Sequence, residues 1–264
     1  MRRRGPRVRT LAADILPAVL SQAFAITVAL ALQAAGQAPP PPAASAWPDD
    51  RPITHLLTNL VTDLGHLPSV GNAAILGIGG AATLAVHPLD DNLADWAGRQ
   101  PSSSYTSFGR AIGDGWVQGG AAVGVYVAGR VASDARLTHI GSDLVRAQAL
   151  NGVLTTALKV VVDRRRPSGG NHAFPSGHTT AAFASAAVLQ SHFGWRTGIP
   201  AYAVAGFVGW TRVRDHVHWL TDVAFGATVG TIAGQTVTRG HRARTWTVVP
   251  AKTAGGFAIY VTRQ

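Results

Sequence analysis

The feature that most limits how this chain can fold is a succession of apolar segments between Ile53 and Val237. Short connections of Gly, Pro, Asp and Ser join these segments. The segments lie near residues 53–67, 70–87, 111–131, 143–163, 177–193, 199–213 and 217–237. Apolar stretches of this length are typical of helices that bury one another around a common core. We therefore expect an all-α fold, a helical bundle formed by residues 53–238.

The polar content of the segments bears on whether they span a membrane, which takes about 20 predominantly apolar residues per helix. The segment 143–163 contains Asp143, Arg146, Gln148, Asn151, Lys159 and Asp163. The mean hydropathy of the chain, +0.15, is low for a protein that crosses a membrane several times. We therefore expect helices buried in a soluble or membrane-associated bundle, with spanning helices as the alternative.

The N-terminal region has the pattern of a segment for export. Five arginines lie within residues 2–9, and an apolar stretch over Ala18–Leu32 follows them. Small residues and a proline tract come next, so we expect residues 1–38 to be a signal peptide cleaved near Ala38, or an uncleaved anchor. Residues 39–52 then form a Pro-rich linker. This pattern predicts an exported domain on the periplasmic or outer side, either free or attached to a membrane.

The C-terminal tail, residues 239–264, differs from the rest of the chain. Its last stretch, TWTVVPAKTAGGFAIYVTRQ, places β-branched and aromatic residues on both sides of a Gly-Gly pair. This alternation around a turn signal predicts a short β-hairpin appended to the bundle.

The charge composition limits the partners. The chain has a formal net charge of +10 and contains no cysteine. A basic chain can bind nucleic acid, anionic lipid or a phosphorylated substrate. The sequence shows no zinc-ligand spacing and no basic tract interleaved with aromatic residues, so we do not expect a nucleic-acid partner. The absence of cysteine excludes disulfides and thiol chemistry.

The first candidate motif is the stretch KVVVDRRRP, residues 159–167. Lys159 and Arg166 are seven residues apart, so on a helix they share a face. Pro167 is expected to end that helix, and Asp163 is spaced to pair with both cations. A solvated helix end would show the same spacing. A phosphate site is favoured because Lys159 is the one lysine of the expected helical domain, in a chain whose only other lysine is Lys252. An ammonium donates compactly to one phosphate oxygen.

The second candidate motif is Pro175-Ser176-Gly177-His178, placed directly before an apolar segment. Ser176 is expected to cap a helix that starts at Gly177. The first turn of a helix offers free backbone N–H groups and the positive end of the dipole, which together bind phosphate. His178 is then placed to give a proton to a leaving oxygen.

The third candidate motif runs from Thr211 to Asp222. His218 and Asp222 are four residues apart, so we expect them to meet on one helix face. A carboxylate on one ring nitrogen leaves the other nitrogen nucleophilic. A buried histidine satisfied by a neighbouring carboxylate is the structural alternative. Arg212 precedes His218 by six residues, so it can contact the same bound phosphate as His218.

Other polar residues support weaker expectations. His216 and His218 are two residues apart, so they point apart on a helix and should not share a metal. Asp215 is expected to pair with a nearby arginine, and His172 could equally line the mouth of the site or lie outside it. Solvated surface is the expectation for Arg164, Arg165 and Arg214, with a basic rim of the site as the alternative. No partner is identifiable from the sequence for His55, His66, His87, His139, His192 and His241.

The three motifs together resemble the K-x6-R-P, P-S-G-H and S-R-x5-H-x3-D signature of the type 2 phosphatidic acid phosphatase family. That superfamily includes bacterial acid phosphatases, lipid phosphate phosphatases and vanadium haloperoxidases. The resemblance covers about residues 159–222. Thr211 stands where the family usually has serine, and it keeps the hydroxyl.

The resemblance implies a mechanism for phosphate ester hydrolysis. His218 would attack phosphorus and form a phosphohistidine, Asp222 would orient the imidazole, and His178 would protonate the leaving alcohol. The phosphate oxygens would be held by Lys159, Arg166, Arg212 and the Ser176 and Gly177 amides. No metal and no cofactor would be required, and vanadate would act as an inhibitor.

The substrate class stays open among lipid phosphates, lipid diphosphates and small phosphomonoesters. The alternative function is a vanadate-dependent haloperoxidase that uses the same site. A non-catalytic phosphate-binding protein is a third reading, disfavoured because every catalytic position is filled. The sequence makes no prediction about oligomeric state.

Overall fold

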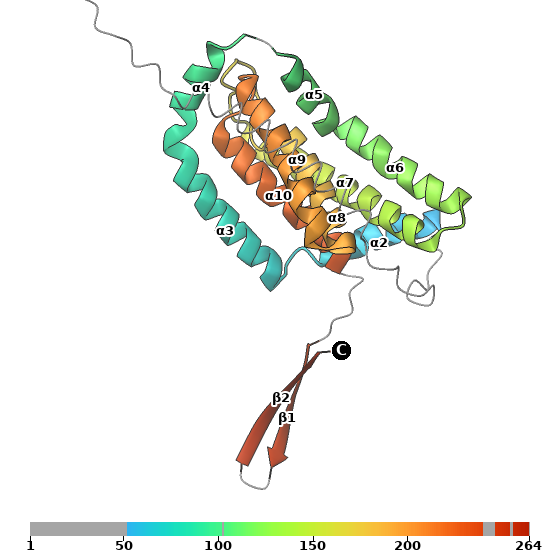
Figure 1. Cartoon of the computed structure of the whole chain (residues 1–264). Helices are drawn as coiled ribbons and strands as arrows, with labels where there is room; N and C mark the ends of the chain where they lie inside the picture. Colours follow the sequence, from blue (N-terminus) through green and yellow to red (C-terminus); the bar gives the residue numbers. More distant parts are fainter. Residues whose placement is uncertain (1–51, 102, 240–245, 254–255, 264) are drawn as a thin grey trace, which may run out of the picture.

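The computed structural model describes residues 52–239 except 102, together with two C-terminal strands (Figure 1). The expected signal segment and nearly all of the expected linker lie outside the described residues. The helices are α2 (Ile53–Gly65), α3 (Val70–Val86), the short 3₁₀ helix η2 (His87–Leu89), α4 (Asp90–Gly98), α5 (Ser104–Gly113), α6 (Gly115–Val131), α7 (Ala135–Val162), α8 (Gly177–Phe193), α9 (Trp195–Arg214) and α10 (Leu220–Arg239). The prediction of a mostly helical body is confirmed.

Two short helices and one long extension were not predicted. The helices α4 and α5 lie in the polar stretch between residues 88 and 113, which lacks a sustained apolar run. Helix α7 begins at Ala135, eight residues before the expected position, because the Asp134 side chain accepts a hydrogen bond from the Leu137 amide (2.9 Å) and caps it. Hydrophobic periodicity misses such elements because caps and buried polar residues determine them.

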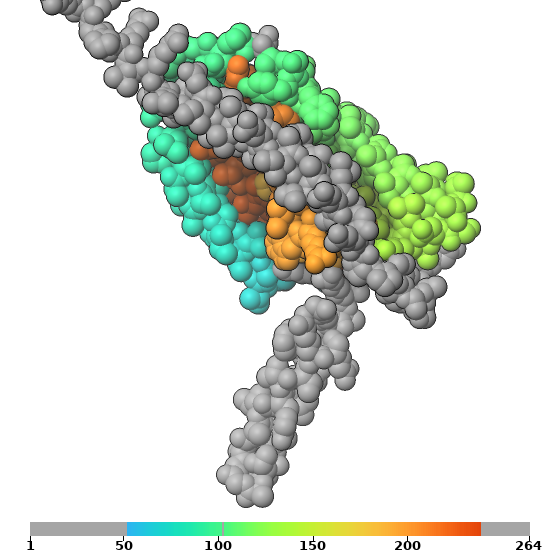
Figure 2. Space-filling view, viewed as in Figure 1, coloured from blue at the N-terminus to red at the C-terminus, as the bar shows by residue number. Residues whose placement is uncertain are grey.

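The centre of the bundle is formed by α7, α8, α9 and α10, with α3 along one edge and α6 along the opposite edge (Figures 1 and 2). The core is built largely from small side chains. Its buried apolar residues include Ala147, Leu150, Ala184, Val188, Ala233 and Val237. Alanine and glycine at facing positions let helix axes approach closely, so the core is filled by backbone as well as by side chains.

A close approach of backbones joins α10 to α8. A Cβ added at Gly230 would overlap the Thr180 carbonyl oxygen, and one added at Gly234 would lie 2.5 Å from the Ala184 carbonyl oxygen. These two glycines are therefore required by space rather than by backbone conformation. These contacts limit how closely α8 and α10 can pack along their length.

Apolar side chains also cover much of the outer surface. On α3, Val70, Ile78 and Leu84 are 90%, 74% and 76% exposed. The stretch Val70–Gly98 is long and apolar enough to cross a membrane, and only 6% of its most apolar window is buried within the protein. It is the candidate span among the described residues. The expectation that the apolar segments are buried is therefore wrong for α3.

The two strands, β1 (Trp246–Thr253) and β2 (Gly256–Arg263), pair antiparallel (Figure 1). Their side chains and the residues 240–245 and 254–255 lie outside what the structure describes. The C-terminal hairpin therefore stays a prediction.

The close packing of α8 against α10 predicts different changes in stability for two Gly→Ala variants. Gly230→Ala should lower the unfolding free energy by about 1–3 kcal/mol, because the added methyl group must push the helices apart. In Gly120→Ala, on the exposed side of α6, the new Cβ meets no described atom within 4 Å. That variant should be neutral or gain up to about 1 kcal/mol from helix propensity. Thermal unfolding measures both, and equal effects would contradict the close packing.

Candidate functional site

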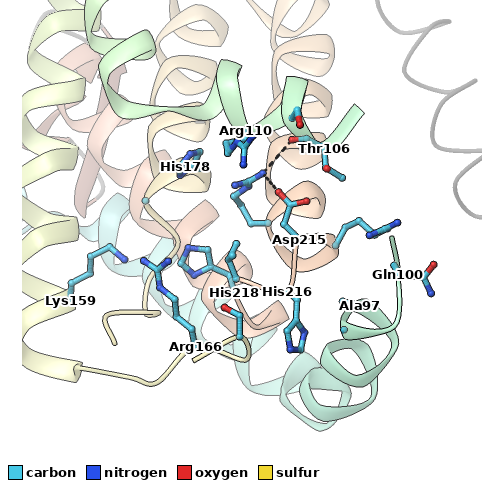
Figure 3. A pocket seen from close by; sticks show the side chains of 17 residues that line it. Ala97, Gln100, Thr106, Arg110, Lys159, Arg166, His178, Asp215, His216 and His218 are labelled. Atoms are coloured by element: carbon cyan, nitrogen blue, oxygen red, sulfur yellow. Dashed lines mark hydrogen bonds and ion pairs between the residues drawn. The ribbon is translucent and has the colours of Figure 1, made fainter. Parts of the chain in front are cut away.

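A cavity of about 770 Å³ lies where the end of α7, the start of α8, the end of α9 and the turn before α10 come together (Figure 3). Helices α4 and α5 border it on the other side. Its lining includes Lys159, Arg166, Gly177, His178, Arg212 and His218, which are six of the predicted site residues. The two remaining predicted residues, Ser176 and Asp222, are fully buried behind this wall.

Lys159 and Arg166 both reach the cavity, but not from one helix face. Helix α7 ends at Val162, and Asp163 adopts a left-handed conformation with φ of 39°. Arg166 therefore lies in the following loop, so the predicted two-turn spacing and the predicted stop at Pro167 are wrong. The prediction that Asp163 holds the two cations is also wrong, since its carboxylate contacts the His172 ring at 3.0 Å.

The loop after α7 positions both cations through its carbonyl groups. Lys159 Nζ donates to the His172 carbonyl oxygen (2.6 Å), and Arg166 Nε donates to the Asn171 carbonyl oxygen (3.2 Å). Burial lowers the pKa of Lys159 to about 8, and the Arg166 guanidinium adds to this lowering. The ammonium group stays charged at neutral pH, and an anion beside it would raise its pKa again.

Ser176 and Gly177 form the start of α8, as predicted. Ser176 occupies the N-cap position, but among the described residues its hydroxyl accepts from Thr179 Oγ1 (2.9 Å) rather than from a first-turn amide. Its own amide donates to the Asp222 carbonyl oxygen (3.0 Å), which ties α8 to α10. The predicted side-chain cap is therefore not formed, and the Ser176 amide is engaged within the fold.

His218 lies in the turn before α10, because that helix begins at Leu220. The predicted contact forms without a shared helix face. His218 Nδ1 lies 3.4 Å from Asp222 Oδ2, which is long for a hydrogen bond. Burial lowers the pKa of His218, and the Asp222 carboxylate offsets part of that lowering. The histidine is therefore held neutral, with its second ring nitrogen free to face the cavity.

Arg164 holds the carboxylate that faces His218. Its Nη1 donates to Asp222 Oδ1 (2.8 Å) and to Thr221 Oγ1 (2.6 Å). Its Nη2 donates to Asp90 Oδ2 (2.9 Å), and its guanidinium lies 5.2 Å from the centre of the Trp219 ring. The expectation of a solvated surface position for Arg164 is therefore wrong. Asp90 was also missed, because it lies far away in sequence in the polar stretch of α4.

Arg212 and His178 both line the cavity, and Figure 3 shows His178 beside Arg110. Arg212 Nη2 donates to Asp215 Oδ2 (2.6 Å), which confirms that Asp215 pairs with an arginine. Burial lowers the pKa of His178 to about 4, and the Arg212 guanidinium is the next largest cause. Asp114, 3.9 Å away, offsets part of this effect. His178 is therefore neutral at neutral pH.

Further polar residues of the cavity were not among the predicted site residues. They include Arg110, Arg214, Gln100 and His216. The expectation of solvated surface is wrong for Arg214, which is 7% exposed. His216 has a positive φ of 59° and lies against α4, where a Cβ at Gly98 would approach its ring to 3.3 Å. Their distance in sequence from the three motifs explains why spacing gave no signal for Arg110 and Gln100.

The cavity has the charge and shape to bind a tetrahedral oxyanion. Lys159, Arg166 and Arg212 line the same cavity as His178 and His218, and Gly177 forms part of the wall. Among the described residues, Asp215 is the carboxylate that lines the cavity, and Arg212 already engages it. The wall thus offers cationic donors to an anion.

Part of the chain is similar in sequence to known proteins. Residues 141–246 match the model of a family described as the PAP2 superfamily, and this range contains all three motifs. A lipid A 1-phosphatase from Porphyromonas gingivalis is 38% identical over 91 residues, which are 33% of this chain and 20% of that protein. The matched region thus spans about a fifth of the relative's length.

Two solved structures are similar in part. Aquifex aeolicus LpxE is 21% identical, with a TM-score of 0.48, covering 57% of this chain and 95% of that chain. A transmembrane PAP2 type phosphatidylglycerolphosphate phosphatase from Bacillus subtilis is 20% identical, with a TM-score of 0.45, covering 64% of this chain and 94% of that chain.

The cationic wall predicts a ligand-dependent titration of His178. Its pKa should be about 4 in the free protein. Inorganic phosphate should raise that pKa, because an anion beside the ring stabilises the protonated form. Histidine NMR resonances followed against pH measure the shift, and loss of the signal in His178→Asn assigns it. A titration that phosphate leaves unchanged would contradict an anion site next to this ring.

Proposed function

The chain belongs to the PAP2 superfamily through residues 141–246, and from this membership we propose that it is a phosphatase that hydrolyses phosphate monoesters carried by lipids. The observation that carries the proposal is that His178, His218 and three cationic side chains line one cavity. An arrangement of this kind supplies a nucleophile, a proton donor and an oxyanion clamp within reach of one phosphorus atom.

In the first step, the ring nitrogen of His218 that does not face Asp222 attacks phosphorus. The bond between phosphorus and the ester oxygen breaks, and His178 transfers a proton to the departing alkoxide. The negative charge of the bound substrate opposes the effect of Arg212 and raises the pKa of His178, so that the ring can carry this proton. The product of this step is a phosphohistidine and a free alcohol.

In the second step, His178 accepts a proton from water as the water oxygen attacks the phosphohistidine. The bond between phosphorus and the His218 nitrogen breaks, and inorganic phosphate leaves. Asp222 stabilises the imidazolium character of His218 through both steps. The cations provided by Lys159, Arg166 and Arg212 stabilise the equatorial oxygens, so this proposal requires no metal at the catalytic site.

A lipid substrate is supported by where the cavity lies along the molecule. The candidate membrane span Val70–Gly98 ends in Ala97 and Gly98, which line the cavity. A phosphate group at the surface of a bilayer would be at the same level as this end of the span. The proposal includes the outer side of the membrane as the location, in line with the export pattern of residues 1–38.

A second cavity gives apolar chains a surface beside the phosphate site. It measures about 700 Å³ and lies between α3, α7 and α10, with a wall that is almost wholly apolar. Leu158 of this wall precedes Lys159, and Phe225 follows Asp222 by one helical turn. A lipid with its phosphate near His218 could thus place an acyl chain along α3.

The test of this function is hydrolysis by the purified full-length chain. We expect release of inorganic phosphate from a lipid phosphate monoester, with inhibition by vanadate and full activity in EDTA at a temperature below unfolding. His218→Ala should lower kcat by at least about 10³-fold, and Asp222→Asn by about 10²- to 10⁴-fold. Acid-labile phosphate on a histidine should be trapped in the wild type and absent in His218→Ala. Near-normal turnover in His218→Ala would refute the assignment of the nucleophile.

Arg164 is predicted to act as a positioning residue through Asp222. Arg164→Ala should lower kcat by about 10- to 100-fold with little change in KM, because His218 loses its orientation while the phosphate clamp is kept. Arg165→Ala removes the same charge from the adjacent, exposed position and keeps the carbonyl that accepts from Trp219, so it is the matched control. Equal losses in the two variants would point to a general effect of charge instead.

A further inference from the structure

A second cluster of polar side chains lies inside the bundle, away from the cavity. His139 and Asp143 are one turn apart on α7, and His192 comes from the last turn of α8. His192 Nε2 lies 2.9 Å and His139 Nδ1 lies 3.9 Å from Asp143 Oδ2. One ligand atom from each side chain lies within 4.8 Å of the other two. We infer that these three side chains bind one divalent transition-metal ion, with zinc as the ion to test.

The donor set fits such an ion. Two imidazole nitrogens and one carboxylate oxygen are donors that zinc accepts, with bonds of about 2.0–2.2 Å. Ligand atoms around a tetrahedral zinc are then about 3.3 Å apart. The distances of 2.9 and 3.9 Å to Asp143 Oδ2 lie on either side of that value. Small side-chain adjustments would therefore close the site around an ion.

A hydrogen bond from Arg146 already fixes the orientation of the Asp143 carboxylate. Arg146 Nη2 donates to Asp143 Oδ1 (2.5 Å), which leaves Oδ2 directed to the two histidines. Arg146 Nη1 in turn donates to Asp63 on α2. Metal-binding carboxylates are commonly fixed by such outer hydrogen bonds, which hold the ligand in place before the ion arrives.

The burial and charge of the cluster also favour a cation. The side chains of Asp63, Asp143 and Arg146 are 1–2% exposed, and that of His192 is 7% exposed. Two carboxylates and one guanidinium leave a single negative charge among these three groups. A buried charge is stabilised by a counter-charge at close range, and a dication held by the two imidazoles and Asp143 would supply it.

The position of the cluster indicates a structural role. His139 precedes Lys159 by 20 residues on the same helix, which is about 30 Å along the axis. An ion bound there would link α7 to α8 and, through Arg146 and Asp63, would brace α2. It would be too far from the cavity to take part in its chemistry. This inference therefore does not depend on the proposed function.

The direct test is zinc binding by the full-length, tag-free chain after removal of metal with a chelator. We expect one equivalent of zinc by elemental analysis and calorimetry, and a rise in Tm of roughly 5–10 °C at zinc concentrations about 100-fold above Kd. Magnesium at the same concentration should have no such effect. Absence of a tight zinc equivalent in the wild type would overturn the inference.

Matched variants locate the ion. His192→Gln should weaken zinc binding by at least about 100-fold and abolish the zinc-dependent rise in Tm. His55→Gln, an exposed histidine on α2, should keep both. Because glutamine retains a hydrogen-bonding group, His192→Gln is expected to fold; His139→Gln provides the same measurement from the other ligand. Unchanged zinc binding in either ligand variant would place the ion elsewhere and overturn the assignment.

Hydrolysis of the lipid phosphate by the metal-free wild type separates the two proposals. Catalysis without zinc, together with zinc-dependent stability, supports a structural ion remote from the catalytic cavity. Zinc-dependent turnover at a temperature where the metal-free chain is folded would contradict the structural role. Failure to hydrolyse any phosphate ester would count against the proposed function alone, since zinc binding is measured independently.

Discussion

The buried carboxylate of Asp222 is the interaction on which the rest of the site depends. Its Oδ1 accepts from Arg164, its Oδ2 accepts from the Trp219 amide (2.9 Å), and it faces the ring of His218. The carbonyl group of the same residue accepts from the Ser176 amide. Because a fully buried charge is costly without partners, this one residue requires the loop after α7, the start of α8 and the turn before α10 to meet.

The small residues of the bundle hold the loop after α7, the start of α8 and the turn before α10 together. Gly230 and Gly234 bring α10 against the carbonyl groups of α8, so the two helices cannot slide or tilt without overlap or loss of contact. The site residues stand at the ends of these helices, or in the segments that join them. Close packing along the length of the bundle therefore determines the geometry at its end, where the chemistry is proposed to occur.

Helix α7 serves two polar sites from a single long element. Lys159 near its C-terminal end lines the cavity, whereas Asp143 and Arg146 near its other end belong to the buried cluster with His192. This double use explains the high polar content that made segment 143–163 look unlike a spanning helix. Polarity in this segment marks buried, partnered side chains, so it is a poor guide to whether the surrounding helices contact water or lipid.

The sequence by itself determined the helical class and, through motif spacing, most of the residues that line the cavity, since helix periodicity and N-cap signals are local. Only the tertiary structure decided which side chains pair. Arg164 bonds to Asp90 and Asp222, which are 74 and 58 residues away, and His192 bonds to Asp143 across 49 residues. The end of α7 at Val162 likewise depended on a left-handed residue that spacing cannot reveal. Such partners are set by which helices pack together, and that information is not contained in any short stretch of chain.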